Sequence, residues 1–179
     1  KLKGVAQHAL AVAEVRTGCV GDFVHLYTDG SFDPDKGGGS NCGWAFVALQ
    51  QPELNVHVYQ FIGVAGGPCF DHDLEPISGL QHASSGGAEL VATFRALMWC
   101  ASAPVVQTLV HFDCIPVGGF VFGSNFSIQS DFAALANLTR ALLRYLRARG
   151  KVIHGVHVHG HDDHPWNELA AGVAKFASR

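Results

Sequence analysis

Runs of apolar and β-branched residues predict five β-strands along the chain. Each run is rich in valine, isoleucine, leucine or aromatic residues, and turn-forming residues lie between most of them. The predicted strands are residues 24–28, 44–49, 56–62, 105–112 and 152–158. The first three follow one another without a helix between them, so they favour an antiparallel meander.

Between the later strands the apolar period changes from two to 3.6, which predicts helices. The first helix runs from about Gly86 to Cys100, and Ser84-Ser85 supply its N-cap. Its expected buried stripe consists of Leu90, Phe94, Leu97 and Met98. Ser130 is expected to cap a later long helix. At most a short helix is predicted over 116–123, and long helices are predicted over 130–150 and 165–177.

The order of these elements predicts a fold of the α/β class. The order is three strands, a helix, a strand, helices, a strand and a last helix. This order gives a meander followed by two right-handed crossovers. The result is a mixed five-stranded sheet, with three antiparallel strands and then two parallel ones, and helices on both faces. We expect residues 22–179 to form this single domain and residues 1–21 to be an N-terminal extension or linker.

Composition agrees with a folded, soluble chain. The 179 residues are 48% hydrophobic and 15% charged, which is typical of one globular domain. No uncharged apolar run approaches the roughly 20 residues of a membrane span, and no signal peptide is evident. Five scattered cysteines without a C-x-x-C spacing are typical of reduced thiols. We therefore expect an intracellular protein, cytoplasmic or nuclear, and the start at Lys1 suggests a piece of a longer polypeptide.

Net charge weighs against one class of partner. The formal net charge is −3 and the pI is near 6.4, so bulk electrostatics do not favour avid binding of nucleic acid. Arg140, Arg144 and Arg147 soften this objection because they fall on one face of the predicted 130–150 helix. This stripe is either a solvated surface or a track for phosphates.

Three acidic residues stand at the ends of predicted elements. Asp29 follows the first strand, Glu89 opens the first helix, and Asp113 ends the fourth strand. An Asp before glycine can simply open a turn, but the first and fourth strands are expected to be neighbours in the sheet. Asp29 and Asp113 would then lie side by side, with the Glu89 helix over them. Such acids repel one another unless a cation lies between them, and oxygen ligands suit Mg²⁺ or Mn²⁺.

Histidines crowd the last predicted strand and the loop after it. They are His154, His157, His159, His161 and His164. Imidazole suits zinc, and alternation places His157 and His159 on one face, but no second group of ligands accompanies them. Surface or hydrogen-bonded histidines are the alternative to a zinc site.

The motifs together resemble one known family. In chain order they are Tyr27-Thr28-Asp29-Gly30-Ser31, Ala88-Glu89-Leu90, Phe112-Asp113, His159-Gly160-His161 and His164-Pro165-Trp166-Asn167-Glu168-Leu169-Ala170. Each motif alone is weakly specific, but their order and their places on the predicted elements are specific in combination. From about residue 23 to 177 the chain resembles a type I ribonuclease H domain, in the style of retroelement reverse-transcriptase polyproteins. The resemblance implies a ribonuclease H-like fold for the predicted sheet.

The resemblance implies endonucleolytic hydrolysis of the RNA strand of RNA–DNA hybrids with two Mg²⁺ or Mn²⁺ ions. It implies that Asp29 binds both ions, that Glu89 and Asp113 complete the ligands of one, and that His161 assists proton transfer or product release. The residues that it places at the substrate are Gly30, Ser31, Ser85, Gly86 and Asn167. The family often has an asparagine before the helix glutamate, and here backbone amides at the helix start would contact the hybrid instead. The resemblance also implies a larger polyprotein and a monomer as an isolated domain.

One position departs from the family pattern. After Asn-Glu-x-Ala the family has an aspartate that helps to hold the ion activating the attacking water, and this chain has Ala171. The departure implies feeble or absent cleavage. An engineered Asp→Ala substitution is the preferred explanation because the neighbouring pattern is intact, and a naturally degenerate domain is the alternative.

Two other functions stay open at this point. A non-catalytic RNA–DNA hybrid-binding or connecting domain of a retroelement polyprotein would keep the fold without the chemistry. A DNA-junction nuclease on the same fold would cut branched DNA and would not require ribonucleotides.

Overall fold

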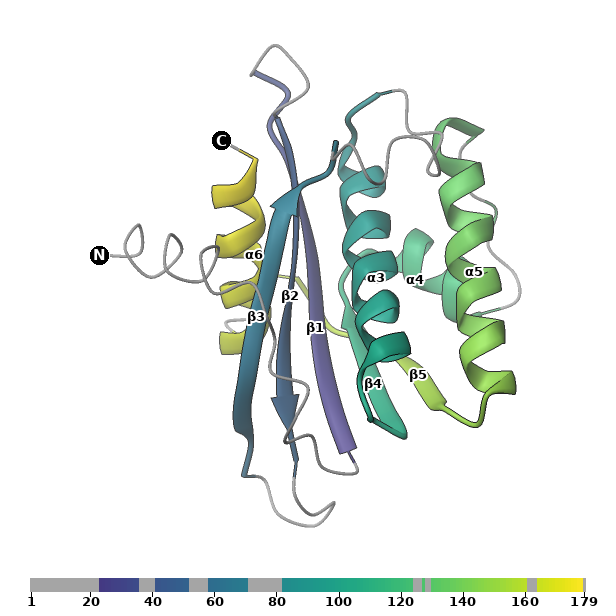
Figure 1. Cartoon of the computed structure of the whole chain (residues 1–179). Coiled ribbons are helices and arrows are strands. Elements are labelled where there is room, and N and C mark those ends of the chain that lie inside the picture. The colour runs from purple at the N-terminus through teal and green to yellow at the C-terminus, as the bar shows by residue number, and fades with distance from the viewer. Residues whose placement is uncertain are drawn as a thin grey trace.

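A mixed five-stranded sheet forms the centre of the molecule (Figure 1). The computed structural model describes residues 23–35, 41–51, 58–70, 82–123, 127, 130–160 and 164–178. The strands are β1 (Phe23–Phe32), β2 (Cys42–Gln50), β3 (Gln60–Pro68), β4 (Gln107–Phe112) and β5 (Val152–His157), in the spatial order β3-β2-β1-β4-β5. Neighbours among β1, β2 and β3 pair antiparallel, whereas β4 pairs parallel with β1 and with β5. The predicted sheet is confirmed.

Helices cover both faces of the sheet, as predicted. They are α3 (Ser85–Ser102), α4 (Ile115–Phe122), α5 (Ala133–Ala148) and α6 (Pro165–Ala177). In Figure 1, α3, α4 and α5 lie on one side of the sheet and α6 lies on the other. The larger apolar core lies under α3 and α5, and smaller clusters lie under α6. Among the described residues, no helix has the length and apolar character that a membrane crossing requires.

Alternation along β1 divides its side chains between these two faces. Val24 and Leu26 are fully buried and belong to the larger core with α3. Tyr27 points the other way and packs with Ala170 of α6. β1 is therefore buried on both faces, and it pairs with a strand on each side.

The third strand differs from its prediction. The sequence predicts a strand over 56–62, but β3 extends from Gln60 to Pro68. The three glycines of this segment disfavour a strand in isolation. A close contact with α6 explains why one of them, Gly66, has no side chain, because a Cβ there would lie 2.7 Å from Cγ1 of Val173. Residues 52–57 lie outside the described ranges.

The first helix agrees with its prediction except for one position on its stripe. Ser84 is the N-cap of α3, and its hydroxyl accepts a hydrogen bond from the Gly87 amide over 3.0 Å. Leu90 and Leu97 are fully buried, whereas Met98 is 47% exposed. Met98 follows Leu97 by one residue, which rotates it about 100° around the helix and out of the core.

The remaining helices refine the predicted boundaries. The short helix expected over 116–123 is α4. The long helix begins at Ala133, after a 3₁₀ turn over Ser130–Phe132, and its N-cap is Phe132 rather than the expected Ser130. The tight turn places Ser130 before the first α-helical residue. The expected extension over 1–21 lies outside the described residues.

Candidate active site

The first acid of the site lies on the central strand of the sheet. The parallel register of β1 and β4 sets Tyr27 opposite His111, so two residues later Asp29 on β1 lies beside Asp113, which directly follows β4. Thr28 contributes to this register because its hydroxyl donates to the His111 carbonyl oxygen over 3.0 Å. The sheet therefore places two carboxylates side by side where pairing changes from antiparallel to parallel.

The second element of the site is the first part of α3. Glu89 lies five residues after the Ser84 cap, and its side chain is only 7% exposed. Gly30 of β1 permits this position, because a Cβ there would collide with the backbone of Ala88 and Glu89. The close approach of helix and strand thus depends on a residue without a side chain.

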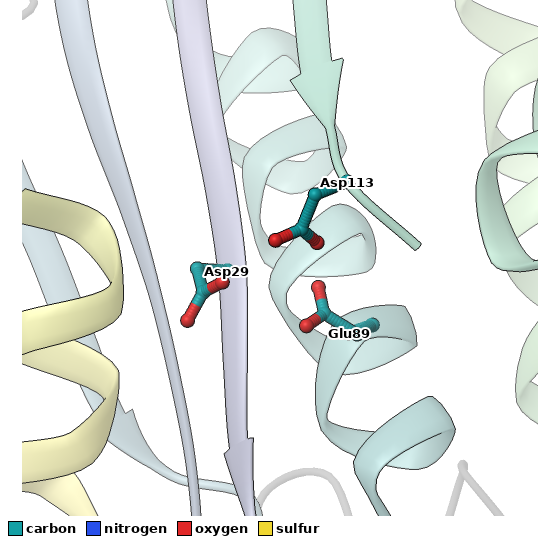
Figure 2. Close-up of side chains that lie close together, drawn as sticks. All are labelled: Asp29, Glu89 and Asp113. Atoms are coloured by element: carbon teal, nitrogen blue, oxygen red, sulfur yellow. The ribbon is translucent and has the colours of Figure 1, made fainter. Parts of the chain in front are cut away.

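The three acids converge at one point (Figure 2). Asp29, Glu89 and Asp113 each offer a carboxylate oxygen, and these oxygens all lie within 4.8 Å of one another. Burial and then Asp113 and Glu168 raise the pKa of Asp29 to about 8. Burial and then Asp29 and Asp113 hold the pKa of Glu89 well above its ordinary value. The cluster would gain from a cation, and its donor set of carboxylate oxygens fits Mg²⁺ or Mn²⁺.

The third side of the site is formed by α6, which packs on β1 and β2. Glu168, in the first turn of α6, is exposed and lies close enough to Asp29 to raise its pKa. Ala171 follows three residues later on the same helix face and is half-buried. The acid nearest to Asp29 on α6 is therefore Glu168, which the sequence reasoning did not select as a site residue. Its spacing of three from Ala171 was the signal available.

No protein-family model and no curated protein sequence matches the chain. A structure of RNase H1 from the halophilic archaeon Halobacterium salinarum has a TM-score of 0.61 and 19% identity, and the match covers 87% of this chain and 96% of that one. The RNase H domain of prototype foamy virus gives 0.56 and 19%, over 87% and 93% of the two chains. The chain has the ribonuclease H fold.

A longer protein also contains a similar structure. The protease-reverse transcriptase of prototype foamy virus has a TM-score of 0.52 and 19% identity, and the match covers 87% of this chain but 20% of that one. The predicted ribonuclease H-like fold is therefore confirmed.

The residues expected at the substrate lie at several places in this ribonuclease H fold. Gly30 contacts α3 and Ser31 is half-buried near the end of β1, while Ser85 is exposed as the first residue of α3. A Cβ at Gly86 would lie 3.1 Å from the Phe132 ring. Asn167 is 3% exposed, and its buried Oδ1 has no hydrogen-bond partner among the described residues. Their substrate roles stay predictions. His161 lies outside the described residues.

This chain also contains a buried stack of imidazole and phenol rings, which the sequence did not predict. The rings of Tyr27 and His111 are 4.2 Å apart and nearly parallel, and His164 lies on the other side of Tyr27 at 4.8 Å. His25 is within 2.9 Å of both His111 and Gln51 through its two ring nitrogens. Burial lowers the pKa of His111 to about 3, so this ring is neutral. Alternation of His25, Tyr27 and Asp29 on one face of β1 was the available signal.

The structure adds little support for the arginine stripe as a track for phosphates or for the histidines as a zinc site. Arg147 donates two hydrogen bonds to the Ile153 carbonyl oxygen, and Arg140 lies over the Phe120 ring, so two members of the arginine stripe have local roles. His154, His157 and His159 are exposed on and after β5. In the part of the chain that the structure describes, the acid triad is the one group of three or more side chains suited to a metal, so the zinc alternative finds no support there.

Proposed function

We propose that this chain is a ribonuclease H-type domain that acts on the RNA strand of RNA–DNA hybrids. The observation that carries the proposal is the convergence of Asp29, Glu89 and Asp113, whose carboxylate oxygens lie within 4.8 Å of one another. A cluster of acids on a surface would not by itself indicate a nuclease. Here the acids lie on β1, on α3 and directly after β4, in a fold shared with an archaeal RNase H1 and a foamy-virus RNase H domain.

The chain's own residues would position the substrate phosphate and the ions. Bound Mg²⁺ or Mn²⁺, two in an intact site, would supply Lewis-acid stabilisation and an activated water for phosphodiester hydrolysis. Asp29 is suited to contact both ions because it lies between the Glu89–Asp113 pair and α6. Glu89 and Asp113 would complete the ligands on the α3 side.

Hybrid recognition would use the backbone and shape of the nucleic acid. The first residues of α3 present backbone amides at a helix N-terminus, where phosphate or 2′-hydroxyl oxygens are favoured. Ser85 and Gly86 are accessible there, since Ser85 is exposed and Gly86 is half-buried. Ser31 would approach the same substrate from β1, and His161 would assist proton transfer or product release.

Residue 171 sets the level of activity that we expect. Ala171 has no ligand atom, so position 171 lacks the carboxylate that ribonuclease H domains have there, and Glu168 is the acid that α6 places near Asp29. We infer that this chain binds hybrid but cuts it feebly, and that restoring an acid at 171 restores cleavage. An engineered substitution and natural degeneration are both compatible with this inference.

The decisive experiment compares this chain with Ala171→Asp on matched RNA–DNA, RNA–RNA and DNA–DNA duplexes in Mg²⁺. We expect Ala171→Asp to cut only the RNA strand of the hybrid, at least about a hundredfold faster than the unchanged chain, because one removed catalytic contact commonly costs this much. Ala171→Asn, which has similar volume but no carboxylate, is the matched control. Absence of cleavage by Ala171→Asp, with its fold intact by circular dichroism, would contradict the nuclease proposal.

Ala171 favours one alternative, a hybrid-binding or connecting domain within a retroelement polyprotein. The similarity to 20% of a foamy-virus protease-reverse transcriptase supports that context. This alternative predicts that Ala171→Asp binds RNA–DNA hybrid as tightly as before and remains inactive. Cutting of branched DNA by Ala171→Asp would instead indicate a junction nuclease.

A further inference from the structure

Two buried thiols lie opposite each other at one end of the β2–β3 pair, outside the acidic site. Cys42 is the first residue of β2, and Cys69 directly follows the last residue of β3. The register pairs Gly43 with Pro68, and the Cys69 amide donates to the Cys42 carbonyl oxygen over 2.9 Å. Each cysteine is 2% exposed and neither is in a disulfide.

The two sulfur atoms interact directly. A hydrogen bond between the thiols lowers the pKa of Cys42 and raises the pKa of Cys69, so Cys42 loses its proton more readily than Cys69, which donates. As a neutral thiol, Cys42 also points its Sγ at the Ser84 carbonyl oxygen, 3.9 Å away. A thiolate next to a second thiol is the arrangement that thiol oxidation requires.

We propose that Cys42 and Cys69 form a reversible disulfide when the protein meets a peroxide. Directly opposed residues of an antiparallel pair have Cα atoms about 4.5–5.5 Å apart, and disulfides span about 4.4–6.8 Å between Cα atoms. The bond therefore needs little movement of the backbone. This inference is independent of the nuclease proposal.

The reaction proceeds in two balanced steps. The Cys42 thiolate attacks one oxygen of hydrogen peroxide, the O–O bond breaks, and hydroxide leaves, which gives the Cys42 sulfenic acid. The Cys69 sulfur then attacks the Cys42 sulfur, the S–O bond breaks, and water leaves with the Cys69 proton. Two thiols are oxidised and one peroxide is reduced. A dithiol reductant reverses the result by thiol–disulfide exchange.

Burial decides which oxidant can react. Because each cysteine is 2% exposed, a molecule as small as hydrogen peroxide reaches the thiols more easily than a peptide disulfide does. β3 is an edge strand, so the pair lies at the margin of the sheet. The other described thiols have different neighbours, since Cys100 bonds to Thr108 and Cys114 lies between β4 and α4.

Oxidation would tie two strands together next to a helix cap. The cross-link closes a loop over residues 43–68 and restricts the unfolded chain, which raises the melting temperature. It also removes the S–H group that points at Ser84, the N-cap of α3. The oxidised protein should therefore melt several degrees higher than the reduced protein, and a reductant should reverse the shift.

The test treats the folded full chain with hydrogen peroxide, blocks remaining thiols with iodoacetamide in denaturant, and maps the linkage by mass spectrometry. Trypsin alone leaves both cysteines in the peptide 37–95, because no Lys or Arg lies between Lys36 and Arg95. Additional cleavage after Glu53 separates Cys42 from Cys69. We expect two linked peptides that are 2 Da lighter than the sum of the free peptides, and that separate on reduction.

Three variants complete the test. Cys42→Ser and Cys69→Ser should each abolish the linked pair and the reversible melting shift, whereas Cys114→Ser should keep both. Links from Cys42 or Cys69 to another cysteine, or two alkylated thiols at 42 and 69 after peroxide, would overturn the proposal. The mapping on the unchanged chain stands even if a variant folds poorly.

Discussion

At the scale of single residues, the site is defined by carboxyl groups that are costly to ionise together. Glu89 is 7% exposed and faces Asp29 and Asp113, and its pKa lies well above its ordinary value. Desolvation is the first cause and like charge the second. The raised pKa values of Asp29 and Glu89 favour their protonated forms in the absence of a cation, and a bound cation would displace these protons.

Replacing one acid by its amide separates the structural and metal-binding roles. We expect Glu89→Gln to leave the metal-free protein at least as thermally stable at pH 8, because a buried carboxyl that is costly to ionise is replaced by a neutral amide. Mn²⁺ affinity, measured by isothermal titration calorimetry, should fall by more than about tenfold because a ligand is lost. Asp35→Asn removes an exposed charge from the turn after β1 and serves as the control. Unchanged Mn²⁺ affinity in Glu89→Gln would contradict the proposed ligand set.

At the scale of elements, local sequence predicted those features that depend on neighbouring residues alone. The strand before Asp29 and the Ser84 cap are of this kind, because alternation and capping chemistry act over a few positions. The glycine-rich end of β3 was missed because α6, which is distant in sequence, packs against Gly66. Met98 was misassigned because apolar periodicity does not show how wide the covered face of a helix is.

The candidate site shows the same division. Asp29, Glu89 and Asp113 could be selected from the sequence because each stands near a point where a predicted periodic run begins or stops, although β1 continues past Asp29 to Phe32. Glu168 and the His111 ring stack were missed because their importance arises only when α6 lies on β1. Spacing along one element could not reveal contacts between elements.

The cap of α3 offers a prediction at this scale. Ser84→Ala removes the hydroxyl that accepts from the Gly87 amide, and we expect the free energy of unfolding in urea to fall by about 1 kcal/mol. Ser102→Ala, at the other end of α3, removes an exposed hydroxyl that donates to the Trp99 carbonyl oxygen and should cost less than about 0.5 kcal/mol. Equal losses in the two variants would show that the N-cap has no special weight.

At the scale of the whole molecule, charge and metal binding are linked. The chain carries a formal net charge of −3, and two bound divalent cations would bring four positive charges to the place where a hybrid would lie. Hybrid affinity should therefore depend on the ions more strongly than it would in a basic protein.

Proton displacement makes metal binding depend on pH. A carboxyl whose folded pKa exceeds its unfolded value stabilises the metal-free fold at low pH, and this contribution is lost as pH rises through the folded pKa, about 8 for Asp29. Cation affinity changes in the opposite direction. We expect Mn²⁺ affinity to increase between pH 6 and pH 8 by about tenfold per pH unit for each proton released.

The difference in melting temperature with and without Mn²⁺ at each pH measures this effect. The buried imidazoles of His25 and His111, whose pKa values are lowered by burial, contribute equally to both samples and cancel in that difference. A difference that stays constant from pH 6 to pH 8 would show that the acids do not release protons to the cation.

The contact at Gly30 has a consequence for how this centre is built. The volume that a methyl group would occupy at residue 30 is filled by the main chain of Ala88 and Glu89. The separation of the three carboxylates therefore depends on the absence of a Cβ atom at Gly30. Any larger residue at position 30 would push α3 away from the sheet. The distances between the three carboxylates would then increase although none of the three acids had been changed.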